Sequence, residues 1–214
     1  MERKVFTVAR QMASGGDQVA ADLAQFFGIP LLERQILEAA AAAAGVSTET
    51  IGEAEKVPSF LERMLEYLGQ HSGGLDPLGN FSMETPAALT MTTDSYRHLI
   101  ENVLRQTAQD SDAVIVAHGG AVILRDLPYV FRVLVCAPFE LRVQRLQEFE
   151  HIPMAEAQHR IREDEKTRLD YFHTYYKVDW LNPSVYDLCI NTARIDTATA
   201  VDLIKEAFAK VVPS

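Results

Sequence analysis

The stretch that decides the fold of this chain is Val5-Phe6-Thr7-Val8-Ala9-Arg10-Gln11-Met12-Ala13-Ser14-Gly15-Gly16-Asp17-Gln18-Val19-Ala20. Its first residues form a short apolar run that predicts a strand, and its last residues open a pattern of apolar residues at helical spacing. The residues in that pattern are Val19, Leu23, Phe26 and Phe27. A strand, a glycine loop and a helix in this order present backbone N–H groups to an anion, so the stretch predicts a phosphate-binding loop.

The loop departs from the P-loop template G-x-x-x-x-G-K-[ST]. Arg10 stands at the first glycine and Gly15 at the second, with four residues between them. Gly16 replaces the lysine and Asp17 replaces the serine or threonine, so the mobile cation that bridges the outer phosphates is absent. Ser14 is expected to cap the helix, and Asp17 to lie in its first turn. A plain strand-to-helix turn capped by these two residues is the alternative interpretation.

Length and composition bound the class of protein. The chain has 214 residues, enough for one α/β domain, with 48% hydrophobic residues and a formal net charge of −10. An acidic surface repels a phosphate backbone, so we expect no nucleic-acid partner, whereas a local basic pocket for a nucleotide is compatible with this charge. Cys136 and Cys189 lie in apolar runs and are expected to be buried free thiols. Neither a signal peptide nor a membrane span is predicted, which makes the cytoplasm the expected location.

Predicted helices and strands alternate along most of the chain. Helical patterns cover residues 31–45, 94–109, 140–150, 154–176 and 196–212, and strand-like runs cover 113–117, 130–137 and 186–192. This alternation predicts a parallel sheet with helices on both faces, where ligands bind at the carboxyl ends of the strands. Residues 9–16, 117–120 and 137–140 should therefore lie together at that edge.

The region between the second and third of these helices has a weaker pattern. A short helix is expected at 47–55, an apolar helical stripe at 60–68 and a long loop at 69–86. The stripe is expected to pack either within the chain or against a second copy, which would give a homodimer. The sequence leaves the choice between these two open.

An ordered set of motifs spans nearly the whole chain. Its members are residues 9–16, Gly28-Ile29-Pro30 with Glu33-Arg34, 114–121 with 123–126, 137–145, Lys166-Thr167-Arg168, Tyr171, Asp179-Trp180 and 186–192. In this order they resemble the cytidylate kinase-like family, a branch of the P-loop nucleoside monophosphate kinases. The resemblance implies a single domain with a three-layer α/β/α P-loop kinase-like fold, a parallel central sheet and a helical lid. The implied regions are a phosphate loop and first helix at 5–28, a monophosphate-binding helical region at 29–110 and the lid at 138–180.

The resemblance also implies an activity and the residues that perform it. The activity is phosphoryl transfer from ATP to a CMP-like nucleoside monophosphate, with Mg²⁺ bound through the nucleotide. Phosphate binding is implied for Ser14, Gly15, Gly16, Asp17 and Gln18, catalysis for Arg10, Arg142, Lys166 and Arg168, and substrate binding for Arg34 and His118. Phosphoryl transfer needs positive charge on the transferring oxygens, so arginines must replace the missing lysine. No metal site built by the protein alone is predicted.

Each of these charged residues has a structural alternative. The arginines of the lid-like helices stand among acids and would pair with them on a solvated surface. Arg145 lies three residues after Arg142 and so neighbours it on the expected helix. Arg34 would pair with Glu38, and His118 would be satisfied by backbone groups at the strand end.

Several residues depart from the pattern of the family. Asp17 and His118 stand where family members carry arginine, and Thr167 and Asp170 replace lid cations. Ala13 replaces a loop glycine and is expected to have an ordinary backbone conformation. Each lost charge-assisted contact costs about 1.5–3 kcal/mol, so the rival hypothesis is a non-catalytic nucleotide-binding or assembly protein that keeps the kinase fold. A dinucleotide-binding oxidoreductase is disfavoured because no G-x-G-x-x-G follows the first strand.

Overall fold

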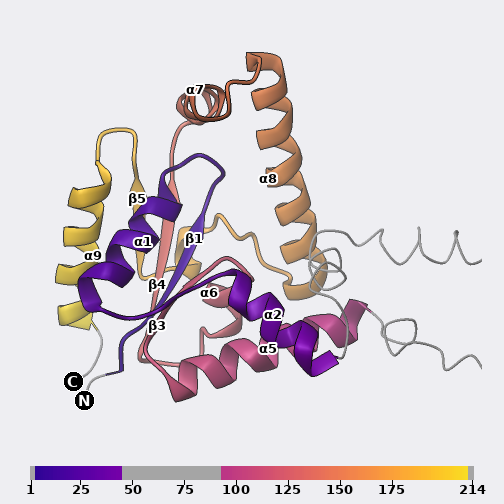
Figure 1. The fold of residues 1–214 in the computed structure, drawn as a ribbon, viewed down its shortest axis with the longest axis vertical. Coiled ribbons are helices and arrows are strands. Elements are labelled where there is room, and N and C mark those ends of the chain that lie inside the picture. The colour runs from indigo at the N-terminus through magenta and orange to yellow at the C-terminus, as the bar shows by residue number, and fades with distance from the viewer. Residues whose placement is uncertain (1–2, 45–92, 212–214) are drawn as a thin grey trace, which may run out of the picture. The chain divides into compact units, whose positions relative to one another are not determined.

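The computed structural model describes residues 3–44 and 93–211 of the chain (Figure 1). The chain divides into two compact units, one comprising residues 1–33 and 104–214 and the other residues 34–103. The second unit falls inside the region 29–110 that was expected to be helical and to bind the monophosphate. Three expected segments lie outside the described residues: the short helix at 47–55, the apolar stripe at 60–68 and the loop at 69–86. The homodimer that the stripe would form therefore stays a prediction.

The first unit is built on a parallel sheet with the strand order β2-β3-β1-β4-β5. The strands are β1 (Val5–Arg10), β2 (Leu31–Leu32), β3 (Ala113–Val116), β4 (Val130–Cys136) and β5 (Leu188–Asn191). Strand β1 is central, since Val5 pairs with Ala113 on one side and with Val130 on the other. The predicted parallel sheet is confirmed. Strand β2 was missed, and the helix predicted from residue 31 is wrong for Leu31 and Leu32, because two residues paired to β3 are too few to leave a periodic pattern.

The described helices match the predicted ones to within a few residues. They are α1 (Gly16–Phe27), α2 (Arg34–Ala44), α5 (Thr93–Asp110), α6 (Gly120–Ile123), α7 (Phe139–Glu150), α8 (Met154–Tyr176) and α9 (Thr197–Val211), with a 3-10 turn at Pro183–Val185. Helix α1 ends at Gly28, whose left-handed φ of 63° lets its N–H return to the Gln25 carbonyl. Helix α9 is preceded by Asp196, whose carboxylate accepts the Thr199 N–H at 2.8 Å. None of the described helices is long and apolar enough to span a bilayer.

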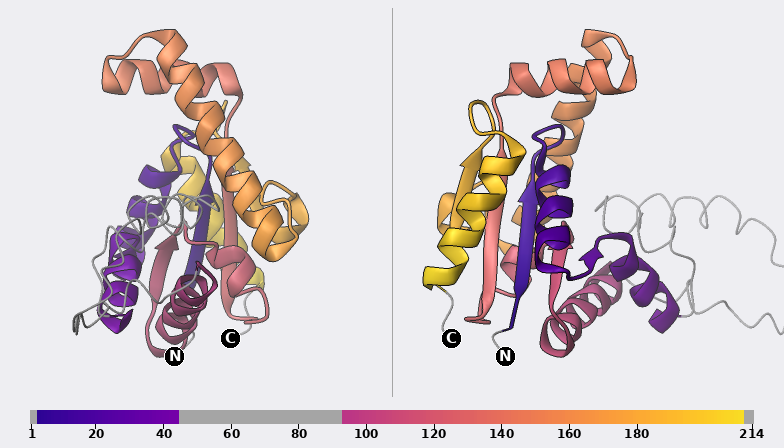
Figure 2. Two further views of the ribbon diagram at one scale, coloured as in Figure 1. Left: turned by 90° about the vertical axis from the view of Figure 1, so that its right-hand side faces the viewer. Right: turned by 60° about the vertical axis from the view of Figure 1, so that its left-hand side comes forward.

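Alternating strand residues face two layers of helices. Toward α1 and α9, the largest part of the core joins Phe6, Val8, Val114, Phe131, Val133 and Ile190 to Leu23, Ile204 and Phe208. On the opposite face, Ala121 of α6 and Leu134 of β4 pack with Trp180 and Tyr186. Figure 2 shows α1 and α9 side by side over one face of the sheet. The predicted three-layer α/β/α fold is confirmed.

The lid-like helices α7 and α8 meet above the carboxyl edge of the sheet, where Figure 1 shows α7 end-on and α8 lengthwise, so that the two helices cross and α8 runs down beside the sheet. Val143, Leu146, Ala157 and Ile161 make their shared core, and Met12 and Ala13 of the first loop pack against it. Arg160 of α8 pairs with Glu150 at the end of α7. The shared core of α7 and α8 therefore packs directly on the loop that follows β1.

The two cysteines are free thiols, but only one fits the predicted burial. Cys136 is half-buried in β4, whereas Cys189 is exposed. Cys189 lies on β5, an edge strand of the sheet that the described residues form. Partial burial raises the pKa of both thiols above the ordinary value.

Candidate functional site

Three segments meet at the carboxyl edge of the sheet, as predicted for residues 9–16, 117–120 and 137–140. The Ala117 N–H donates to the Val8 carbonyl, and the Gln11 N–H donates to the Val135 carbonyl. The Ala137 N–H donates to the Gln11 side-chain oxygen at 3.2 Å. The ends of β1, β3 and β4 therefore surround one site, as the topology of a parallel sheet requires.

The first loop turns sharply between β1 and α1. The Ser14 N–H donates to the Gln11 carbonyl, and Gly15 takes a left-handed φ of 84° as the residue before the helix. The first hydrogen bond of α1 runs from the Val19 N–H to the Gly15 carbonyl. The N–H groups of residues 16–18 lie before this bond, in the first turn of the helix, where backbone donors have no partner within the helix. Such groups at a helix N-terminus are suited to an anion.

The cap predicted at Ser14 is wrong. Gly15 precedes the helix, and no side chain among the described residues caps it. The Ser14 side chain is fully buried and its hydroxyl has no hydrogen-bond partner in the described part of the chain. The glycine takes the cap position because it adopts the left-handed conformation at no steric cost.

The backbone expected at Ala13 is also wrong. Its φ is 58°, in the left-handed region that costs an ordinary residue about 1–2 kcal/mol. The methyl group packs against the apolar cluster of α7 and α8, which includes Val143 and Ile161. Burial of one methyl contributes about 0.8 kcal/mol and offsets much of this strain.

Compared with the P-loop template, the cation and the glycine have changed places. Arg10 stands where the template has its first glycine, and Gly16 stands where the template has its lysine. A Cβ added at Gly16 would lie 2.4 Å from the Cβ of Arg10 and 3.1 Å from that of Val135. Carbon atoms in contact normally lie about 3.5–4.0 Å apart, so position 16 has no room for a side chain. The stem of Arg10 fills the space that a residue at position 16 would need.

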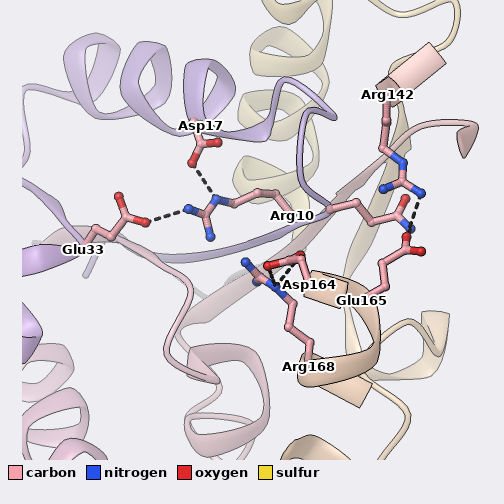
Figure 3. A network of polar contacts seen from close by, with 8 residues as sticks. Arg10, Asp17, Glu33, Arg142, Asp164, Glu165 and Arg168 are labelled. Atoms are coloured by element: carbon pink, nitrogen blue, oxygen red, sulfur yellow. Dashed lines mark hydrogen bonds and ion pairs between the residues drawn. The ribbon is translucent and has the colours of Figure 1, made fainter. Parts of the chain in front are cut away.

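The guanidinium of Arg10 is held between two carboxylates (Figure 3). Its Nε lies 2.5 Å from Asp17 Oδ1, and its Nη2 lies 2.6 Å from Glu33 Oε1. The side chain of Arg10 is 13% exposed, whereas those of Asp17 and Glu33 are 65% and 49% exposed. The predicted catalytic cation therefore lies at the loop, with Nη1 outside both ion pairs.

Arg142 lies in a second polar cluster, which joins the loop to both lid-like helices. Its side chain is almost fully buried; Nε donates to the Ala137 carbonyl at 2.9 Å, and Nη2 lies 2.6 Å from Glu165 Oε1 (Figure 3). The same carboxylate oxygen accepts the Gln11 side-chain N–H at 2.9 Å. Sequence reasoning gave Gln11 no role, although it lies within the stretch that decides the fold, and expected Glu165 only as one of several acids that pair with lid arginines.

Arg145 and Thr192 both contact the Ser14 carbonyl of the loop between β1 and α1. The Thr192 hydroxyl donates to the Ser14 carbonyl at 2.6 Å, and Arg145 Nη1 donates to the same carbonyl at 3.2 Å. Arg145 also donates to the hydroxyl and carbonyl oxygens of Thr192, both at 2.9 Å. Thr192 follows β5, and no signal in the sequence connects it with the loop.

The remaining predicted cations lie along α8. Arg168 pairs with Asp164 one turn earlier, at 3.0 Å (Figure 3). Its guanidinium also lies over the Trp180 ring, 5.6 Å from the ring centroid. Lys166 is exposed on the same helix. Arg168 therefore makes the ion pair with an acid that we considered as the alternative to a catalytic role. Its catalytic role stays a prediction.

Arg34 and His118, the two predicted substrate-binding residues, both make the contacts within the protein that we considered as alternatives to substrate binding. In the second unit, Arg34 Nε lies 3.0 Å from Glu38 Oε1, with both side chains more than half exposed. In the first unit, His118 is buried, and its Nε2 lies 2.8 Å from the Glu33 carbonyl. Because a carbonyl only accepts, Nε2 carries the proton in this contact. Ala117 and His118 both have positive φ, 65° and 52°, so the turn after β3 is strained.

Fold and loop together define an α/β protein of the P-loop kinase class. Over residues 5–194 the chain matches the cytidylate kinase-like family, and it belongs to that family. It is 27% identical over 147 residues to a cytidylate kinase from Desulfurococcus amylolyticus, a match that covers 68% of this chain and 75% of that protein. A cytidylate kinase from Methanopyrus kandleri is 28% identical over 116 residues, which cover 50% of this chain and 60% of that protein.

Solved structures with the same fold include one close in shape and two kinases. An uncharacterized protein from Eubacterium ventriosum superposes with a TM-score of 0.68 at 20% identity, over 97% of this chain and 99% of that one. A gluconokinase from Sinorhizobium meliloti superposes with a TM-score of 0.51 at 13% identity, over 99% of this chain and 94% of that one. A shikimate kinase from Bacteroides thetaiotaomicron superposes with a TM-score of 0.50 at 12% identity, over 96% of this chain and 98% of that one. These similarities concern the fold.

Proposed function

We propose that the chain transfers a phosphoryl group from ATP to a nucleoside monophosphate of the CMP type, with Mg²⁺ carried by the nucleotide. The observation that carries the proposal is the exchange of Arg10 and Gly16 in the loop. The template places glycine first and lysine second, and this chain places a cation first and glycine second. A positive side chain is thus retained at the loop although the lysine is absent. Family membership and the kinase fold support the same activity.

The residues present fit a bound triphosphate. Left-handed Gly15 and the adjacent Gly16 place two consecutive residues without side chains at the start of α1. Backbone N–H groups of residues 15–18 would hold the phosphates, and the dipole of α1 favours their charge. ATP with its Mg²⁺ supplies the phosphoryl group when bound. The part of this chain is to orient that group and to exclude water from it.

The carboxylates on Arg10 do not prevent it from binding phosphate. Ion pairs with exposed partners contribute about 0–1 kcal/mol each, and Asp17 and Glu33 are both largely exposed. A charge-assisted hydrogen bond to a phosphate is worth about 1.5–3 kcal/mol. Arginine presents its donors as a fork that matches phosphate oxygens. The guanidinium can therefore keep one carboxylate and donate its remaining N–H groups to the nucleotide.

The activity is tested by ADP formation with ATP, Mg²⁺ and a panel of CMP, UMP, AMP and GMP. We expect turnover with at least one acceptor, a strong loss of it in Arg10→Met and a partial recovery in Arg10→Lys. Arg105→Met is the matched control, because Arg105 also pairs with an exposed carboxylate, that of Asp126 at 3.0 Å. Turnover with no acceptor, or equal turnover in Arg10→Met and the wild type, would refute the proposal.

A non-catalytic nucleotide-binding protein is the second candidate. It is favoured by the two carboxylates that pair with Arg10 and by the contact of His118 with the Glu33 carbonyl, which engages one of its ring nitrogens within the protein. Calorimetry with ATP separates the two candidates. Binding without turnover would support the second candidate, and the absence of both would point to an assembly role for the fold.

A further inference from the structure

The Ser14 carbonyl is held by two side chains that come from distant parts of the chain. Thr192 follows β5 and Arg145 lies on α7, and both donate to this one oxygen. Thr192 is buried and Arg145 is partly buried. Arg145 also donates twice to Thr192, so the two residues hold each other in place. The Ser14 hydroxyl takes no part, since it has no hydrogen-bond partner among the described residues.

The position of this carbonyl determines the direction of a neighbouring N–H. The peptide between Ser14 and Gly15 is planar, and in a trans peptide the C=O and N–H point in opposite directions. An oxygen held toward Arg145 and Thr192 therefore directs the Gly15 N–H away from them. Gly15 has φ 84° and adopts many other conformations readily, so its peptide needs such a restraint. A guanidinium on the carbonyl also polarises the peptide and makes its N–H a stronger donor.

We propose that Arg145 and Thr192 are positioning residues for the phosphate loop. They fix the Ser14–Gly15 peptide in the orientation in which the Gly15 N–H donates to a bound phosphate. The inference rests on the proposed function, because it assumes that this loop binds a nucleotide. Neither residue touches the nucleotide; both act through the backbone of the loop.

The test removes the hydroxyl of Thr192 while its shape is kept. Thr192→Val is nearly isosteric, and Thr192→Ser keeps the hydroxyl and serves as the matched control. Calorimetry with pyrophosphate and with ATP should give a dissociation constant about tenfold higher for Thr192→Val, as expected for the loss of one preorganised hydrogen bond, and near wild type for Thr192→Ser. The KM for ATP should rise in Thr192→Val while the KM for the acceptor stays unchanged.

A second variant and a spectroscopic readout separate positioning from general stability. The Gly15 amide resonance in a ¹⁵N-labelled protein should shift or broaden in Thr192→Val and in Arg145→Lys, and stay in place in Thr192→Ser. A loss of stability alone would leave this resonance unchanged at temperatures well below unfolding. An unchanged Gly15 resonance together with unchanged pyrophosphate affinity in both variants would overturn the inference. Wild-type protein that binds neither ATP nor pyrophosphate would instead refute the proposed function and, with it, the purpose of the restraint.

Discussion

The exchange of Arg10 and Gly16 makes a quantitative prediction about two substitutions. Gly16→Ala places a Cβ 2.4 Å from the Cβ of Arg10. Because a Cβ is fixed to its backbone, a change of side-chain rotamer cannot relieve this overlap. Overpacking of this kind costs about 1–3 kcal/mol, against which alanine in a helix gains about 1 kcal/mol over glycine. Arg10→Gly removes the obstructing atoms, so the double variant should escape most of the clash. We expect a coupling energy of about 2 kcal/mol between the two substitutions.

The coupling is measured by urea unfolding of the wild type, both single variants and the double variant. The chain has a single tryptophan, and Trp180 is 2% exposed in the first unit, so its fluorescence reports on the unit that contains the loop. A control cycle pairs Arg10→Gly with Gly28→Ala, at the other end of α1. An added Cβ at Gly28 would meet nothing within 4 Å, and its cost comes from its φ of 63° alone.

The result that would refute this reasoning is additivity. If the Arg10→Gly and Gly16→Ala effects sum to within about 0.5 kcal/mol, as for independent sites, the two positions do not share the space. The control cycle with Gly28→Ala should be additive. A thermal melt gives a second measure, since about 2 kcal/mol corresponds to about 4–8 °C in Tm for a chain of this size.

Three other substitutions test neighbouring parts of the site. Asp17→Asn should tighten ATP binding about fivefold in calorimetry, because a carboxylate and a phosphate charge about 4 Å apart repel by ~1 kcal/mol in water-like surroundings. Arg142→Met should destabilise the protein by about 3 kcal/mol in urea unfolding, since it strips Glu165 of its cation in a largely buried pair; an effect below about 1 kcal/mol would contradict that burial. Asp196 has a pKa held below its ordinary value by the Thr199 N–H, so its contribution is present above the pKa of the unfolded chain and disappears as the pH falls through the folded pKa. Asp196→Asn should therefore reduce the fall in Tm between pH 5 and pH 3, while equal falls in both proteins would contradict this cap.

Much of the fold could be predicted because it depends on local patterns. The apolar run of β1, the helical spacing in α1 and the buried run of β3 each leave a period within a few residues. Helices α7, α8 and α9 were found for the same reason. Strand β2 left no such pattern, since Leu31 and Leu32 become a strand only by pairing with Val114 and Ile115.

The loop itself was predicted in outline and wrong in detail. The strand–glycine–helix order is confirmed, but Gly15 rather than Ser14 precedes the helix, and Ala13 is left-handed. Local preferences favour a serine cap and an ordinary alanine. The packing of Ala13 against the α7–α8 cluster and the hold on the Ser14 carbonyl override them. Local preference amounts to about 1 kcal/mol for a serine cap and about 1–2 kcal/mol against a left-handed alanine, so several tertiary contacts of the loop together outweigh it.

By itself, the sequence of this protein determined the alternation of strands and helices, the parallel sheet and the edge where the site lies. Only the tertiary structure decided that Arg10 occupies the space of a side chain at position 16, and that Thr192 reaches Ser14 across 178 positions in the chain. The reason is that hydrophobic periodicity reports on neighbours within a helix or strand. Contacts between residues that are far apart in the chain depend on how the packed layers bring them together.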